Sequence, residues 1–304
     1  MTVRSSATNP TTFRQICRAA SVGSPAFKTL SGEQGASVLG VTSRGVFVQT
    51  FDRRVLFVSF ETYRGPLTLT LAEVPARLRS VQTGAPLRIA RGGLVFPAAG
   101  LAISAAAGAV WLPPTRPEPA GPRLEQRARL KWMAQEIIAR RGDSGLGGLL
   151  PPLLELPPSG PGQMLAGALR LQQGLADQDA SRIVAALVPC LGRGPGLTPA
   201  GDDFTLGLLL ALNRWPEGSG LQGELERLNR AILEAARRRT TTLSANLIEC
   251  AALGQADERL VNALDCIYTG RPGPEESVSG LLAWGASSGV DALVGMAVNV
   301  LREA

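Results

Sequence analysis

Two hydrophobic periods divide the chain. Between residues 36 and 112, short apolar runs alternate with polar positions, and turn-forming residues separate the runs. Residues 67–71 alternate strictly between leucine and threonine, which is typical of a strand with one buried face. Short strands at such close spacing favour an antiparallel barrel or sandwich. We predict strands at 37–41, 46–51, 55–60, 67–71, 87–90, 93–96, 101–104 and 109–112.

The apolar spacing changes to a helical period after residue 123. Leu130, Met133 and Ile137 recur at intervals of three and four, and Gly142 stands where a C-cap is expected. We predict helices at 124–140, 164–175, 180–191, 204–214, 221–238, 243–253, 258–268, 276–284 and 290–301. The predicted fold class is therefore α+β, with a β-rich N-terminal half and a mostly α-helical C-terminal half.

Proline marks the change of period. The segment 115–122 is rich in proline, which resists both helix and strand, so it reads as a linker. We predict a β-rich domain over 31–116 and a helical domain over 117–304. The N-terminal segment is rich in Ser, Thr and Arg and lacks the apolar run of a secretory signal, so 1–30 is predicted to be a flexible lead-in.

Composition narrows the chemistry. Hydrophobic residues make up 45% of the chain, enough to bury a sizeable core. The chain has no histidine, which excludes a Ser-His-Asp triad, a Cys-His dyad and imidazole metal ligands. Proton transfer must then use carboxylates, Lys, Tyr, Cys, water or the substrate. Oxygen ligands would favour a magnesium-like ion.

Charge, hydropathy and cysteine content also limit the binding partners and the cellular location that the sequence suggests. The net charge is +6, but the arginines are scattered and aromatic residues are only 5%, which argues against nucleic-acid binding. No apolar run is long enough to span a membrane. The four cysteines form no CxxC and suggest no disulfide framework. We expect a cytoplasmic protein that binds a small anionic molecule.

The most specific motif is the glycine-rich segment 192–204, GRGPGLTPAGDDF. Prolines fix the shape of such a loop, and glycines let backbone N–H groups approach a small anion. A second run of glycines, 145–148, follows no predicted strand and is not a dinucleotide fingerprint. The residues expected to bind substrate or phosphate in the first motif are Gly194, Gly196, Thr198 and Gly201.

Two adjacent aspartates end this motif, where a helix is expected to begin near Phe204. One of them, Asp202 or Asp203, could cap the helix, but the second adds repulsion unless a cation lies nearby. We therefore predict both as catalytic candidates for proton transfer, with helix capping as the alternative. With Asp291, they are also the alternative ligand set for a Mg²⁺ ion; otherwise we expect no metal and no cofactor.

Two further segments open helices with anion-binding side chains. Residues 238–244 combine arginines with hydroxyls, and residues 284–291 place serines and an aspartate after a small-residue loop. Ordinary helix capping is the alternative for both. If the three loops converge, they line one site. The candidates are Arg238, Arg239, Thr240, Thr241, Thr242, Ser287, Ser288 and Asp291.

These three motifs resemble those of the AllH-like family, the small subunit of bacterial oxamate carbamoyltransferase. The resemblance rests on 194–204 and is supported by 239–244 and 287–291. It implies a cytoplasmic transferase subunit that works with FdrA-type and companion larger subunits in a multi-subunit complex of allantoin degradation, a purine catabolism pathway. In the family's third motif a histidine often stands where this chain has Ala286, so the chain departs from the pattern there.

Three functions stay open. The first is a carbamoyltransferase subunit acting on carbamoyl phosphate and a small carboxylate amide of the oxamate/oxalurate type. Its chemistry needs a stabilised phosphate leaving group and a base for the amine, roles open to the loop amides and to Asp202 or Asp203. The second is a non-catalytic assembly subunit of such a complex. The third is a Mg²⁺-dependent hydrolase or phosphotransferase that uses Asp202, Asp203 and Asp291.

Overall fold

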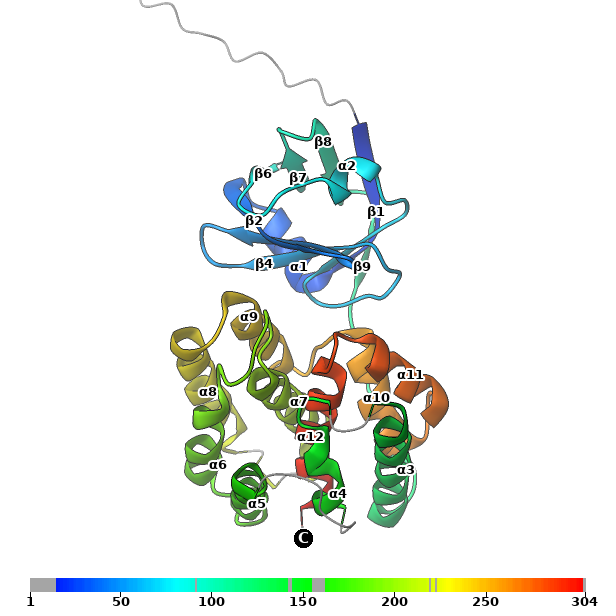
Figure 1. Ribbon diagram of the computed structural model, residues 1–304, viewed down its shortest axis with the longest axis vertical. Helices are drawn as coiled ribbons and strands as arrows, with labels where there is room; N and C mark the ends of the chain where they lie inside the picture. Colours follow the sequence, from blue (N-terminus) through cyan, green and yellow to red (C-terminus); the bar gives the residue numbers. More distant parts are fainter. Residues whose placement is uncertain are drawn as a thin grey trace, which may run out of the picture. The chain divides into compact units, whose positions relative to one another are not determined.

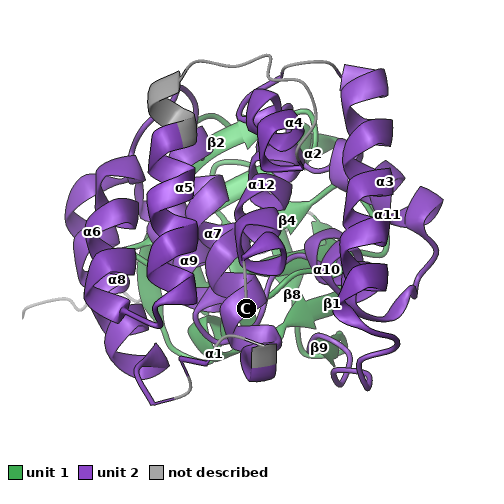
Figure 2. Cartoon of the chain, turned by 90° about the horizontal axis from the view of Figure 1, so that it is seen from below, with its two compact units in different colours: residues 1–111 green, residues 112–304 purple. Residues whose placement is uncertain are grey.

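The computed structural model describes residues 15–90, 92–141, 144–154, 162–218, 220–221 and 223–302. The chain forms two compact units, Met1–Trp111 and Leu112–Ala304 (Figure 1, Figure 2). The division falls at the end of the last strand, a few residues before the predicted domain boundary at 116/117. The proline-rich segment 115–122 therefore belongs to the second unit.

The first unit is a β-barrel. Its strands follow the order β5-β4-β3-β2-β6-β7-β8-β1-β9, and an additional pairing of β1 with β5 closes the sheet. Its elements are β1 (Gln15–Gly23), α1 (Ser24–Leu30), β2 (Gln34–Thr42), β3 (Gly45–Thr50), β4 (Val55–Ser59), β5 (Thr68–Leu71), α2 (Ala76–Arg79), β6 (Pro86–Ala90), β7 (Gly93–Phe96), β8 (Leu101–Ser104) and β9 (Ala109–Trp111).

The barrel is mixed, whereas an antiparallel one was predicted as the first alternative. β1 pairs in parallel with β8 and β9, and β4 pairs in parallel with β5, while the remaining pairings are antiparallel. The α+β fold class with a β-rich N-terminal half is confirmed. Alternate side chains of the strands, such as Val46, Val48, Leu56 and Val58, fill the barrel interior.

The structure differs from the predicted lead-in over 1–30. Residues 1–14 lie outside the described residues, but β1 and α1 occupy 15–30. β1 does not alternate regularly, since its first half is mostly exposed and its second half is more buried. It pairs with β8 and β9 on one edge and with β5 on the other. Val22 of β1 and Leu30 of α1 are buried in the barrel core. Its strand character therefore comes from long-range pairing, which local composition does not reveal.

The second unit is helical. Short 3₁₀ turns precede or follow some of its helices, and all the predicted helices are present with boundaries within a few residues. Its helices are α3 (Arg123–Arg141), α4 (Leu150–Leu153), α5 (Gly162–Ala176), α6 (Ala180–Leu187), α7 (Ala200–Arg214), α8 (Leu225–Arg239), α9 (Thr242–Ala251), α10 (Glu258–Thr269), α11 (Pro274–Ala283) and α12 (Ser288–Leu301). The predicted C-cap at Gly142 lies outside the described residues.

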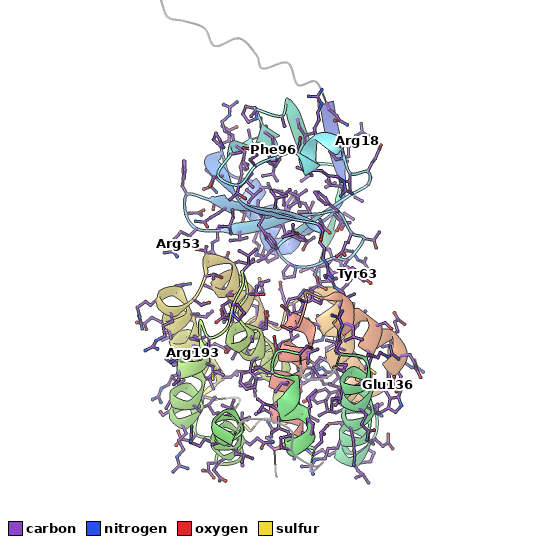
Figure 3. The ribbon with its side chains drawn as sticks, viewed as in Figure 1. Arg18, Arg53, Tyr63, Phe96, Glu136 and Arg193 are labelled. Atoms are coloured by element: carbon purple, nitrogen blue, oxygen red, sulfur yellow. The ribbon has the colours of Figure 1, made fainter. Side chains whose placement is uncertain are left out.

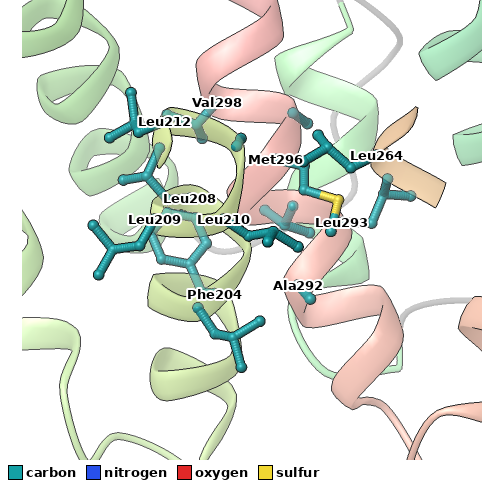
Figure 4. Close-up of a cluster of buried hydrophobic side chains, with 14 of the residues drawn as sticks. Phe204, Leu208, Leu209, Leu210, Leu212, Leu264, Ala292, Leu293, Met296 and Val298 are labelled. Atoms are coloured by element: carbon teal, nitrogen blue, oxygen red, sulfur yellow. The ribbon is translucent and has the colours of Figure 1, made fainter. Parts of the chain in front are cut away.

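Helices α7 and α12 form the centre of this unit. Almost all residues of both helices are buried and most are apolar, as expected of helices covered by other helices all round. Phe204 and Leu208 of α7 pack with Leu293 and Met296 of α12 in the common core (Figure 4). No helix in the described part of the chain combines the length and apolar character needed to cross a bilayer.

Glycines allow these two helices to touch through their backbones. A Cβ atom on Gly207 would lie 1.9 Å from the carbonyl oxygen of Ala292, and one on Gly295 would lie 2.0 Å from that of Phe204. Such approach is possible only without a side chain, so the two glycines set the separation of α7 and α12. This contact also places the first turns of both helices at the same end of the unit, where the candidate site is built.

Candidate functional site

The three loops singled out in the sequence lie together. Thr241 Oγ1 donates a hydrogen bond to the carbonyl oxygen of Leu197 at 2.8 Å, which joins the second loop to the first. The hydroxyl oxygens of Thr198 and Ser288 lie 3.3 Å apart, which joins the first loop to the third. The N-terminal ends of α7, α9 and α12 therefore converge. We call Asp202, Asp203 and Asp291, with the hydroxyls around them, the aspartate cluster.

Helix α7 begins at Ala200, one turn earlier than predicted. Pro199 is its N-cap, and no side chain caps the helix. The backbone N–H groups of Asp202 and Asp203 both donate to the carbonyl oxygen of Pro199. The two aspartates therefore lie inside the first turn, where a negative charge complements the helix dipole, while the N-cap position itself is filled by Pro199.

The glycine-rich loop folds directly over this first turn. Gly201 donates its N–H to the carbonyl oxygen of Arg193 at 2.9 Å, and a Cβ on Gly201 would lie 2.0 Å from the carbonyl oxygen of Cys190. Beyond this contact the loop is exposed, and Arg193 extends from it (Figure 3). Gly194 and Gly196 have φ values of +119° and +95°, which favour glycine.

Asp202 connects the first and second loops through hydrogen bonds to its carboxylate. It is buried, and its Oδ1 accepts the N–H of Gly192 at 2.8 Å. Its Oδ2 accepts the hydroxyl of Thr240. Gly192 has a φ of +74°, and a Cβ there would lie 2.3 Å from the carbonyl oxygen of Arg239. Since both oxygens of Asp202 are used by the protein, its role in this arrangement is to hold the loops in position.

Asp203 has fewer hydrogen bonds to its carboxyl oxygens than the other two aspartates of the cluster. Its side chain is 1% exposed, and among the described residues its Oδ2 has no hydrogen-bond partner. Burial raises the pKa of Asp203 well above its ordinary value, and the negative charges of Asp291 and Asp202 raise it further. Hydrogen bonding to Ser288 and Thr198 lowers that pKa in part. Asp203 therefore keeps its proton to a higher pH than a solvated aspartate does.

Asp291 is held by a fourth segment. Its Oδ1 accepts the N–H of Leu146 at 2.6 Å, and Ser287 Oγ donates to its Oδ2 at 3.0 Å. Burial raises the pKa of Asp291 to about 6. Gly145, with a φ of +60°, packs so closely that a Cβ would lie 2.2 Å from Asp291 Oδ1. Sequence reasoning missed this segment, although its run of glycines was the available signal.

The predicted arginines do not gather at the cluster. Arg238 lies on the exposed face of α8, where it pairs with Glu234 at 2.6 Å along the same helix. The Arg239 side chain is exposed as well. Arg141, which sequence reasoning did not single out, donates instead to the carbonyl oxygens of Leu282 and Ala286 and supports the third loop.

The hydroxyl candidates have divided roles. Thr241 is the N-cap of α9 and accepts the N–H of Ser244 at 3.0 Å, so the capping alternative holds for this residue. Thr242 is the first residue of that helix. Thr198, Thr240 and Ser288 contact the aspartates or one another across loops.

The structure does not assemble the alternative magnesium site. No group of three His, Cys, Asp or Glu side chains in the described ranges is arranged to hold a metal ion. Asp202 and Asp291 direct both their oxygens to protein donors on different segments. The ligand set of Asp202, Asp203 and Asp291 predicted as the alternative therefore has no common centre.

Part of the chain, including this region, is similar to a protein family model. Residues 190–300 match the family model described as oxamate carbamoyltransferase subunit AllH. The matched segment contains all three loops of the site, and it supports the AllH-like assignment predicted from the motifs. No curated protein and no solved structure matches the chain.

Proposed function

We propose that this chain, AllH-like by its match over residues 190–300, is the subunit of a carbamoyltransferase that carries part of the reaction centre. The reaction joins carbamoyl phosphate to a small carboxylate amide of the oxamate/oxalurate type. The observation that carries the proposal is the convergence of the three matched loops on Asp203, a buried carboxyl with one unpartnered oxygen. Larger FdrA-type and companion subunits complete the cytoplasmic complex, which serves allantoin degradation.

The reaction sets the demands on the site. The amide nitrogen of the acceptor forms a bond to the carbamoyl carbon, and the bond from that carbon to the phosphate oxygen breaks. The nitrogen loses one proton, which passes to a base or to the departing phosphate. A carboxyl with a raised pKa suits this step, because it can both accept and return a proton near neutral pH. In this chain, burial raises the pKa of Asp203 well above its ordinary value.

The neighbouring groups support these roles. The exposed glycines of the first loop, Gly194 and Gly196, offer backbone N–H groups to a phosphate. Thr198 and Ser288 orient Asp203 through their hydroxyls. Asp202 acts as a positioning residue, because both its oxygens are occupied by Gly192 and Thr240.

The test is transfer activity of the reconstituted complex with Asp203→Asn. We expect kcat to fall by about 10²–10⁴-fold, the usual contribution of a general acid–base group, while circular dichroism and complex assembly stay unchanged. Asp179→Asn is the matched control, because Asp179 is an aspartate at the start of α6 whose side chain caps that helix. Full transfer activity of the Asp203→Asn complex would refute a catalytic role for this residue.

A non-catalytic assembly role is the second candidate. It is favoured by Asp202 and Asp291, whose four oxygens all bind donors of the same chain and so stabilise the loops themselves. In that case the exposed loop around Arg193 is a contact surface for a companion subunit. Full activity of a complex that carries Asp202→Asn and Asp203→Asn together would establish this second role over the first.

A further inference from the structure

The first loop of the candidate site carries an arginine, Arg193, to which the proposed transfer reaction has so far given no role. Residues 193–197 of this loop are all exposed. Both ends of the exposed stretch are held by hydrogen bonds. Gly201 donates its N–H to the carbonyl oxygen of Arg193 at 2.9 Å, and Thr241 Oγ1 donates to that of Leu197 at 2.8 Å. The exposed residues therefore stand on a loop whose two ends are fixed.

The backbone of Arg193 packs against the first turn of α7. Its N–H donates to the carbonyl oxygen of Cys190 at 3.1 Å, and a Cβ on Gly201 would lie 3.4 Å from the Cβ of Arg193. Burial raises the pKa of the Cys190 thiol, and the positive charge of Arg193 lowers it in part, so the guanidinium stays near this end of the helix. Asp203, the carboxyl with the unpartnered oxygen, follows Gly201 by two residues.

No carboxylate within the described ranges forms an ion pair with Arg193. The acidic residues of the two helices that contact the first loop, α8 and α9, are paired with other arginines. These pairs are Glu226 with Arg230, Glu234 with Arg238 and Glu249 with Arg237. The buried carboxylate of Asp202 is bonded to Gly192 and Thr240. The guanidinium of Arg193 is therefore available to an anion from outside the chain.

The backbone N–H groups that follow Arg193 are available as well. Gly194 and Gly196 are exposed, and neither N–H donates to an acceptor in the part of the chain that the structure describes. A Cβ on Gly196 would meet nothing within 4 Å, so the space beside this residue is open. Unpaired backbone N–H groups in a loop of this kind add hydrogen-bond donors for an anion.

A second cation belongs to the backbone next to this loop. Arg239 is the last residue of α8, and its carbonyl oxygen would lie 2.3 Å from a Cβ on Gly192, the residue before Arg193. The Arg239 side chain is exposed, and it too forms no ion pair with a carboxylate of the described ranges. Two guanidinium groups suit a phosphate dianion, because each supplies one positive charge and a planar fork of N–H donors.

We propose that Arg193 binds the phosphate group of the donor substrate, together with the N–H groups of Gly194 and Gly196 and with Arg239 as the second cation. This inference rests on the proposed function and adds to it the side chain that recognises the phosphate. The groups are all hydrogen-bond donors, which favours phosphate over the acceptor substrate, whose amide also needs an acceptor. Phosphate binding by the loop leaves Asp203 to exchange the proton.

Calorimetric titration of the full chain with inorganic phosphate, and separately with oxamate, tests the proposal and distinguishes the two anions. We expect saturable binding of phosphate with a Kd below about 1 mM and weaker binding of oxamate. Arg193→Gln should raise the Kd for phosphate at least about tenfold, because it removes a charged hydrogen-bonding partner. Arg230→Gln is the matched control, since Arg230 is exposed on α8 and pairs with Glu226, and it should leave the Kd unchanged.

A second measurement needs no variant. In an NMR titration of the native chain with phosphate, the backbone N–H signals of Gly194 and Gly196 should shift, while that of Gly254, beyond the opposite end of α9, should not. The proposal is overturned if phosphate does not bind, if oxamate binds more tightly than phosphate, if Arg193→Gln leaves the Kd unchanged, or if the two glycine signals stay fixed.

Kinetics of the reconstituted complex separate this inference from the proposed function. Arg193→Gln should raise the KM for carbamoyl phosphate about tenfold and leave the KM for the acceptor unchanged. Asp203→Asn should lower kcat and leave the Kd for phosphate unchanged. Phosphate binding that depends on Arg193, in a complex that has no transfer activity, would refute the proposed function and support the phosphate site.

Discussion

Thr240 donates a hydrogen bond to the buried carboxylate of Asp202, which lies in the first turn of a different helix. Thr240→Val keeps the shape of the side chain but leaves a buried carboxylate oxygen unpaired. We expect the free energy of unfolding to fall by about 1–3 kcal/mol, measured by urea denaturation. Thr240→Ser should recover most of the loss, since it restores the hydroxyl. Equal stability of the valine and serine variants would show that this hydrogen bond has no net effect.

The pH dependence of stability tests the buried carboxyl of Asp291. Its pKa is about 6 in the folded chain and about 3.9 in an unfolded one, so the folded state binds more protons between these values. The contribution of Asp291 to stability is therefore fully present below about pH 4 and is lost as the pH rises to about 6, by up to about 3 kcal/mol. Burial also raises the pKa of Asp203, which acts in the same direction.

Asp291→Asn isolates this contribution. The amide can still accept the N–H of Leu146 but does not titrate, so the variant should gain stability relative to the native chain as the pH rises from about 4 to 6. Denaturation curves at several pH values in this interval give the difference directly. A difference that is the same at every pH would contradict a raised pKa for Asp291.

The contact of α7 with α12 predicts that Gly207 cannot accept a methyl group. A Cβ at this position meets backbone rather than a movable side chain, so Gly207→Ala should lower the free energy of unfolding by more than about 3 kcal/mol. Gly167→Ala in α5 is the matched control. Nothing lies within 4 Å of a Cβ there, so it should stabilise the chain by about 0.5–1 kcal/mol. Similar effects of the two changes in thermal denaturation would refute the close contact.

The buried ion pair between Arg214 and Asp265 gives a fourth prediction. Both side chains are less than a tenth exposed, and Asp265 also accepts the indole N–H of Trp215. Asp265→Ala leaves the guanidinium of Arg214 buried without its partner, so we expect a loss of about 3–5 kcal/mol in denaturant unfolding. Replacing both residues with apolar ones of similar size should cost less than the single change, and the opposite order would contradict this account.

Local pattern was sufficient for most elements of the fold. The strict alternation of 67–71 predicted β5, whose leucines lie in the barrel core although its threonines are buried as well. The helical spacing after residue 123 predicted α3, whose buried residues recur at intervals of three and four. β1 was not predicted, since its burial pattern shows no regular alternation and its place in the sheet depends on pairing with distant strands. Its pairing partners lie up to about ninety residues away in the chain.

The first residue of α7 also depends on contacts that local sequence pattern does not show. The apolar spacing begins at Phe204, so the sequence predicted the helix there, but Pro199 and the overlying loop start it at Ala200. The glycines and the aspartate pair could be identified from residue type alone. Which aspartate would be tied by Thr240 and which would keep a free oxygen depends on contacts between loops that are far apart in sequence.

The direct backbone contact of α7 and α12 has a mechanical consequence. From Asp203 to Trp215 the chain rises about 18 Å at 1.5 Å per residue, so a single helix connects the aspartate cluster at one end with the buried ion pair of Arg214 and Asp265 at the other. At Gly207 and Gly295 the backbones of the two helices are in direct contact, which opposes sliding of one helix along the other. The first turns of α7 and α12, which carry Asp203 and Asp291, are therefore held at a fixed separation.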